Sequence, residues 1–208
     1  MKIICKTTLL PPPVVRETRI TIRLDDPSSL AWGMQHLVFA SGHQNVEIDW
    51  DDGCCEEIKT GGAVTHTYPR AGEYVVRIAD GVSELRCSTK TPSSVYRTTY
   101  AKAIREFVTN AALLIRLGYN GFYDAANLAT FQCEGSGLCE LGPNTFGMCP
   151  ALRGRIALPG IIKVSANSFI DCPNITELQF SKENEAIITA LAGYETHFGA
   201  ENAVVSFD

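Results

Sequence analysis

The 208-residue sequence lacks any apolar run near the ~20 residues that a membrane-spanning helix requires. It also lacks a cluster of lysine and arginine, and its formal net charge is −5. Nucleic-acid partners and anionic membrane surfaces need a concentrated basic face, so we expect neither a nucleic-acid partner nor membrane insertion. The apolar run in the first residues is too short and broken for a signal-peptide core. The sequence leaves the compartment unknown, and the cytoplasm is the default expectation.

Motifs of known chemistry are also missing. No Gly-x-Ser-x-Gly elbow, no His-Glu-x-x-His and no phosphate-binding glycine loop occurs. No Cys-x-x-Cys occurs either, and Cys133 and Cys139 have no second ligand pair for zinc. His66 has no partner arranged by sequence, and such a histidine is usually structural. We therefore expect no enzyme and no cofactor, although the lack of a known motif does not exclude one.

What the sequence does contain is a repeat in its C-terminal half. Phe122, Phe146 and Phe169 follow one another in steps of 24 and 23 residues, and the same steps lead from Ala125 to Cys149 to Cys172. A fixed period of this length predicts a solenoid, whose repetitive surface usually serves binding. The two cysteines share a position with alanine, so we expect small, tightly packed core residues there.

Each repeat continues into a segment with the alternating pattern of a short strand. The expected strands lie in residues 128–133, 152–158 and 175–180, and the second is one residue longer than the others. A leading strand is expected in residues 112–119, a capping helix in 183–193 and a last strand in 203–207.

If the apolar residues of these strands point inward, polar residues form an outer face along one sheet. The candidates for a ligand surface are Thr130, Gln132, Glu134, Arg155, Ala157, Glu177 and Gln179. Their mixed polarity suits a protein or glycan ligand of unknown identity better than a lipid. A merely solvated face explains the same pattern equally well.

The N-terminal half predicts a different architecture. Strand-length runs occur at residues 19–24, 36–40, 46–50 and 73–78, separated by turn-rich segments. Such a pattern predicts a small antiparallel β-sandwich. Residues 88–94 have linker composition, so we divide the chain into a sandwich, 1–90, and a solenoid with its helix and strand cap, 91–208. The fold class is mainly β with short helices.

An acidic turn follows the strand at residues 46–50. Asp49, Asp51 and Asp52 could contribute oxygen ligands to a calcium ion, or they could bond nearby backbone N–H groups in a solvated turn. The residues favour the second interpretation, because three carboxylates in four residues do not supply the roughly six to eight oxygens that calcium takes. No other metal site is expected.

The N-terminal half resembles PKD-like modules of the immunoglobulin type. Residues 48–53, Ile-Asp-Trp-Asp-Asp-Gly, are similar to the Asp-x-Gly-Asp-Gly motif of these modules, and residues 65–68 and 71–78 are similar to their His-x-Tyr and Gly-x-Tyr-x-Val motifs. Asp51 stands where those modules usually have glycine, which reaches a positive φ without steric cost.

The repeats resemble BspA-type leucine-rich repeats through their Phe-x-x-Cys-x-x-Leu steps, and residues 198–208 are similar to the ends of such proteins. The combined resemblance implies an adhesin-like interaction protein, at the cell surface or associated with a phage. Two alternatives stay open: a structural scaffold or decoration protein, possibly encoded by a prophage, and an accessory to a glycan-directed enzyme. Likeness of fold does not fix function.

Overall fold

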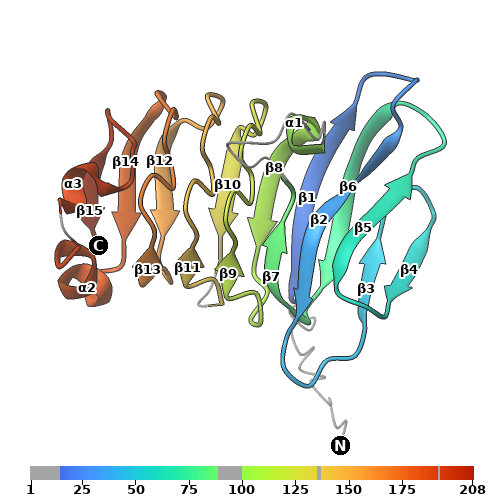
Figure 1. The fold of residues 1–208 in the computed structure, drawn as a ribbon, viewed down its shortest axis with the longest axis horizontal. Helices are drawn as coiled ribbons and strands as arrows, with labels where there is room; N and C mark the ends of the chain where they lie inside the picture. Colours follow the sequence, from blue (N-terminus) through green and yellow to red (C-terminus); the bar gives the residue numbers. More distant parts are fainter. Residues whose placement is uncertain (1–14, 89–99, 135–136, 192) are drawn as a thin grey trace, which may run out of the picture.

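The computed structural model describes residues 15–88, 100–134, 137–191 and 193–208, and it confirms a mainly β fold. A sandwich passes into a stack of coils along the long axis (Figure 1). The strands are β1 Glu17–Leu24, β2 Ala31–Phe39, β3 Val46–Asp49, β4 Cys55–Ile58, β5 Gly62–Thr67, β6 Gly72–Ala79, β7 Val82–Arg86, β8 Ile104–Thr109, β9 Arg116–Leu117, β10 Thr130–Cys133, β11 Glu140–Leu141, β12 Gly154–Leu158, β13 Lys163–Val164, β14 Ile175–Phe180 and β15 Val204–Phe207. The helices are α1 Tyr100–Ala103, the 3-10 helix Lys182–Asn184, α2 Glu185–Thr189 and α3 Tyr194–His197.

The expected sandwich is formed by β1–β7, whose mutual pairings are antiparallel. One six-stranded sheet has the order β10-β8-β1-β6-β3-β4, and the second has the order β13-β11-β9-β7-β2-β5. Alternation places Ile20 and Ile22 of β1 in the core together with Trp32 and Met34 of β2. Because burying these side chains is the main favourable contribution to folding, the alternation fixes which face of each strand is covered.

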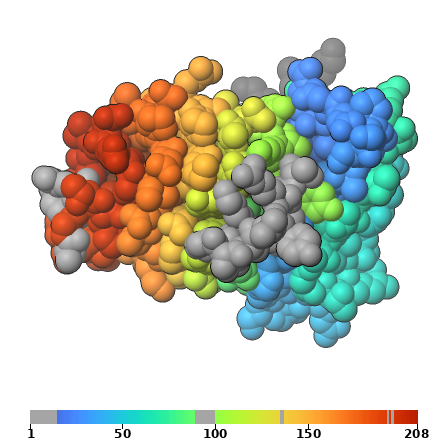
Figure 2. Space-filling model, turned by 45° about the horizontal axis from the view of Figure 1, so that its top comes forward, coloured from blue at the N-terminus to red at the C-terminus, as the bar shows by residue number. Residues whose placement is uncertain are grey.

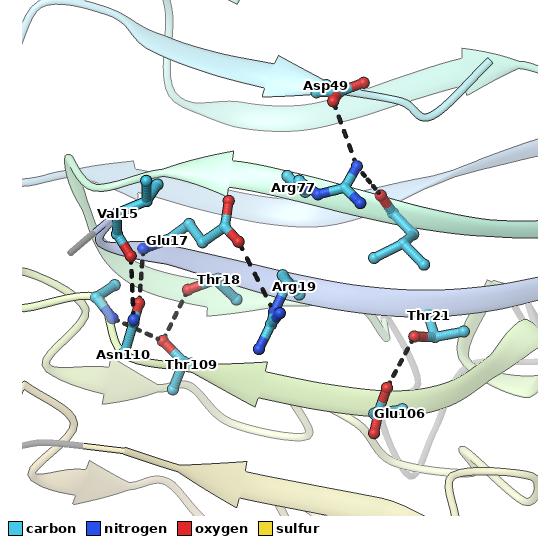
Figure 3. A network of polar contacts seen from close by, with 12 residues as sticks. Val15, Glu17, Thr18, Arg19, Thr21, Asp49, Arg77, Glu106, Thr109 and Asn110 are labelled. Atoms are coloured by element: carbon cyan, nitrogen blue, oxygen red, sulfur yellow. Dashed lines mark hydrogen bonds and ion pairs between the residues drawn. The ribbon is translucent and has the colours of Figure 1, made fainter. Parts of the chain in front are cut away.

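Both sheets of the sandwich continue into the coils. Strand β8 pairs antiparallel with β1, and β9 pairs parallel with β7. Figure 3 shows the first junction, where the buried hydroxyls of Thr18 and Thr109 lie 2.9 Å apart and Asn110 Oδ1 accepts a hydrogen bond of 2.8 Å from the Glu17 N–H. One cluster of buried apolar side chains spans both halves. Residues 89–94 of the expected linker, and the boundary placed within it, lie outside the described residues.

The phenylalanine repeat is a ladder of stacked rings, which confirms the solenoid-like arrangement. Ring centroids of Phe122 and Phe146 are 5.5 Å apart and those of Phe146 and Phe169 are 5.2 Å apart, both pairs being stacked. Cys149 and Cys172 are buried core residues, as expected. Their Sγ atoms lie 3.3 Å and 2.9 Å from the carbonyl oxygens of Phe122 and Phe146, so each thiol donates to the preceding coil.

Left-handed backbone positions recur in each coil. The residue two before each ladder phenylalanine is asparagine, with φ of 54° at Asn120, 52° at Asn144 and 60° at Asn167. Asparagine tolerates this region better than most residues because its short side chain can bond locally. The turns also pair between coils, since the N–H groups of Phe122 and Phe146 donate to the next coil at 2.7 Å each.

The prediction that the outer face forms one sheet is wrong. Strand β10 ends the first six-stranded sheet, whereas β12, β14 and β15 form a separate parallel sheet of three strands. The extra residue of the second repeat lies at this break: Gly154 has a φ of +72°, and the register between β12 and β14 shifts after it. A bulge of this kind bends a strand and ends its pairing on one side.

The C-terminal cap is shorter and more broken than expected. The predicted helix at 183–193 is a 3-10 turn, Lys182–Asn184, followed by α2, Glu185–Thr189. The strand expected at 203–207 is β15, Val204–Phe207, and of the leading strand at 112–119 only β9, Arg116–Leu117, is a strand. Within the described residues no helix combines the length and apolar character needed to span a membrane.

Candidate ligand-binding groove

The break between the two sheets opens into a groove on the outer face of the coils. Its volume is about 530 Å³, and it runs between β10 and β12, which lie side by side in Figure 1. We call it the β10–β12 groove; it is lined by Ala129, Thr130, Phe131, Gln132, Cys133, Glu134, Arg153, Arg155, Ile156 and Ala157.

Strand alternation builds the walls and the floor. Gln132 and Arg155 are exposed, whereas Phe131 and Ile156 are buried beneath them. Phe131 is held by a T-shaped contact with Phe146, whose ring centroid lies 4.8 Å away. Because Phe131 packs against the ladder in this way, the polar side chains lie above a firmly held floor.

The structure places five of the seven predicted surface residues at the groove: Thr130, Gln132, Glu134, Arg155 and Ala157. The other two, Glu177 and Gln179, lie on β14, beyond β12 on the same face, in register with Arg155 and Ala157. Glu177 also accepts a hydrogen bond of 2.5 Å from Ser206 of β15. The predicted face is therefore divided, with a groove at one end and a paired sheet at the other.

Two arginines give the groove a positive wall. Arg153 and Arg155 are both exposed, and neither has an ion-pair or hydrogen-bond partner among the described residues. Sequence reasoning missed Arg153. The available signal was the extra residue between Leu152 and Ile156, because a bulge projects residues out of the regular pattern.

Charges on the opposite sheet are arranged differently. Arg116 of β9 lies 3.4 Å from Glu84 of β7 and 3.1 Å from Glu140 of β11, and Glu140 also lies 3.1 Å from Lys163 of β13. Opposite charges there neutralise one another from strand to strand. The unpaired arginines are thus a property of the β10–β12 groove and not of every face of the coils.

The backbone of the groove is also unpaired. Strand β10 is hydrogen-bonded to β8 on one side, and β12 to β14 on one side, but β10 and β12 are not neighbours in either sheet. In the described part of the chain each strand therefore presents an open edge to the groove. Open edges offer N–H donors and C=O acceptors to an extended ligand.

The acidic turn follows β3, at the end of the sandwich that lies away from the coils and the groove (Figure 1). Asp49 Oδ1 accepts from the Asp51 N–H at 2.9 Å, and Asp51 Oδ2 accepts from the Val75 N–H at 2.8 Å. Arg77 lies 3.4 Å from both carboxylates. These oxygens already bond to the backbone and to a cation, as the solvated-turn interpretation expects. Calcium binding stays the less favoured alternative.

Asp52 makes a contact that corrects the view of His66 as isolated. Asp52 Oδ2 lies 2.8 Å from His66 Nε2, with both side chains almost wholly buried. Burial alone would raise the pKa of the Asp52 carboxyl, but hydrogen bonds from His66 and from the Cys54 N–H outweigh it and hold that pKa below its usual value. Strand β4 and the crossing to the other sheet lie between the two residues, so their spacing in sequence gave no sign of the contact.

This contact belongs to the motif that resembles PKD-like modules. The rings of Trp50 and His66 are stacked with centroids 4.8 Å apart, and the rings of Tyr68 and Tyr74 are tilted with centroids 4.1 Å apart. Comparison with protein families bears the resemblance out. Residues 25–92 match the PKD domain family model. The PKD domain is of the immunoglobulin-like type, which indicates a module for adhesion or binding. No curated protein and no solved structure matches the chain.

Proposed function

We propose that this chain is a non-enzymatic binding protein and that its β10–β12 groove holds an extended ligand bearing carboxylates, either a protein segment or an acidic glycan. The observation that carries the proposal is the groove itself, which combines two strand edges and two arginines that have no partner among the residues the structure describes. Guanidinium groups bind carboxylates in bidentate fashion, with geometry as well as charge.

The shape of the groove supports an extended ligand. An open strand edge satisfies the main chain of a peptide, or the hydroxyl groups of a sugar, at regular intervals. Gln132 and Thr130 supply adaptable donors and acceptors beside the arginines. Glu134 at the end of β10 disfavours a ligand that is anionic along its whole length, so we expect isolated carboxylates spaced by neutral groups.

We infer that the coils are leucine-rich repeats of the BspA type and that the chain is adhesin-like, with the PKD domain as a rigid support for the coils. This is supported by the recurring phenylalanine, cysteine and leucine positions and by the stacked rings of the ladder. No described residue is assigned a catalytic role.

Arrays of peptides and of acidic glycans, probed with the labelled chain, test the proposal. We expect binding to probes with spaced carboxylates, and a loss of at least about tenfold in affinity for Arg155→Gln. Arg70→Gln is the matched control, because Arg70 is an exposed arginine of the PKD domain far from the groove. Equal losses in both variants would show a nonspecific charge effect and contradict the proposal, as would tight binding that survives Arg153→Gln together with Arg155→Gln.

A further inference from the structure

Three potential metal ligands meet at the end of the PKD domain that lies away from the coils. One ligand atom from each of Cys54, Glu56 and His66 lies within 4.8 Å of the other two. Glu56 Oε1 lies 3.7 Å from His66 Nδ1 and 3.9 Å from Cys54 Sγ. Tetrahedral zinc holds such donors about 3.5 Å apart, given bonds of roughly 2.0–2.3 Å, so shifts of a few tenths of an ångström to about 1 Å would bring the three atoms into place.

The histidine is already oriented for this role. Asp52 Oδ2 lies 2.8 Å from Nε2, which places the proton on that nitrogen and leaves the lone pair of Nδ1 on the side of Cys54 and Glu56. The Trp50 ring, stacked 9° from parallel, holds the plane of the imidazole. A carboxylate that receives the far N–H of a histidine is the usual positioning partner of a metal-bound imidazole.

The local charge favours a cation. Asp52 and Glu56 both carry carboxylates beside His66, and the only ion-pair partner of either in the described residues is that histidine. Burial, together with the charges of Glu56 and Asp52, raises the pKa of the Cys54 thiol. The negative surroundings that oppose a free thiolate also attract a divalent cation, and its binding would release the thiol proton to solvent.

We propose that Cys54 Sγ, a carboxylate oxygen of Glu56 and Nδ1 of His66 bind one zinc ion, with Asp52 as a positioning residue. A thiolate, an imidazole and a carboxylate form a donor set that suits zinc better than calcium or magnesium. Three protein ligands leave a fourth position for water. The site is distinct from the acidic turn residues Asp49 and Asp51, whose carboxylates contact Arg77.

The placement gives the ion a structural consequence. Cys54 directly precedes β4 and Glu56 lies in it, and β4 is the outer strand of one sheet. His66 lies in β5, the outer strand of the other sheet. A bound ion would therefore join the two sheets at the open end of the sandwich. The opposite ends of both sheets are already covered by the coils (Figure 1).

The full chain, reduced and freed of metal with a chelator, tests the site by titration with zinc chloride followed by calorimetry and thermal unfolding. We expect one ion per chain and a higher melting temperature with zinc. Cobalt substitution should give a thiolate-to-metal charge-transfer band. Cys54→Ser should remove that band, and Cys54→Ser or Glu56→Gln should weaken zinc binding at least about tenfold.

Cys55→Ser is the matched control, because Cys55 is exposed and contacts Glu47 on the other face of β4. This variant should bind zinc with wild-type affinity. Three results would overturn the proposal: no stoichiometric binding by the wild-type chain, wild-type affinity in Cys54→Ser, or an equal loss in Cys55→Ser, which would reveal adventitious binding by the adjacent thiols. Glu56→Gln separates loss of a ligand from misfolding, because Glu56 is a surface residue with 41% of its side chain exposed and its replacement should leave the fold intact.

Discussion

Truncating Phe146 to alanine tests whether the PKD domain and the coils unfold as one unit. Phe146 is fully buried, and its ring contacts those of Phe122, Phe131 and Phe169 at 5.5, 4.8 and 5.2 Å. Removal of a buried phenylalanine ring costs about 3–5 kcal/mol, and the three ring contacts place this site toward the upper end. With a urea m-value of about 2.5 kcal/mol/M, a loss of about 4–5 kcal/mol should lower the unfolding midpoint by roughly 1.6–2 M.

The tryptophans make the assay selective. The chain has two, Trp32 and Trp50, both fully buried in the sandwich, so their fluorescence reports on that half alone. Far-ultraviolet circular dichroism reports on both halves. Because the sheets run from one half into the other, we expect Phe146→Ala to lower the midpoint by the same amount with both probes.

Two further variants serve as a positive and a negative control. Ile48→Ala removes a fully buried side chain from the sandwich and should also shift both probes together, whereas Ile187→Ala trims a side chain that is 48% exposed and should shift neither by much. An unchanged fluorescence midpoint in Phe146→Ala, with a separate early transition by circular dichroism, would refute a shared cooperative unit.

Three further substitutions test local features, each by urea unfolding. Gly154→Ala should lower the free energy of unfolding by about 1–2 kcal/mol, because φ is +72°. No atom lies within 4 Å of the added carbon, so this loss would come from the backbone conformation alone, and a smaller loss would mean that the bulge relaxes. Met148→Asn should stabilise by about 0.5–1 kcal/mol, because methionine is held there at a φ of 58°, and any loss of stability would contradict this. Glu140→Gln should cost about 1 kcal/mol in low salt and less in 1 M salt, since its contacts with Arg116 and Lys163 are partly exposed; a cost independent of salt would argue against an electrostatic origin.

The sequence predicted features that depend on local pattern. The phenylalanine ladder, the buried cysteines and the inward positions of β10, β12 and β14 all follow from a period or an alternation, and the structure confirms them. The short strands β11 and β13 were missed because two residues hold no alternation. Strand β8 was missed as the link between the halves, because strand partners depend on tertiary packing that propensity does not encode.

The β10–β12 groove was predicted only in part, because the local pattern gives the direction of its side chains but not the pairing of its strands. Alternation identified Gln132 and Arg155 as outward-facing residues, but it could not show that the sheet breaks between them. The one-residue insertion was visible in the sequence, yet its effect on pairing depends on the backbone of Gly154. The contact between Asp52 and His66 requires the turn between β3 and β4 to meet β5 of the opposite sheet, which no local pattern reports.

Hydrogen–deuterium exchange measured with and without the strongest probe from the peptide and glycan arrays tests the central claim, that the β10–β12 groove is the binding surface. Because the facing edges of β10 and β12 are unpaired, their outward amides should exchange readily in the free chain. We expect the probe to slow exchange in segments 129–134 and 153–157 and to leave exchange in strands β9, β11 and β13 unchanged. Protection confined to those strands or to the PKD domain, with the groove unaffected, would contradict the claim.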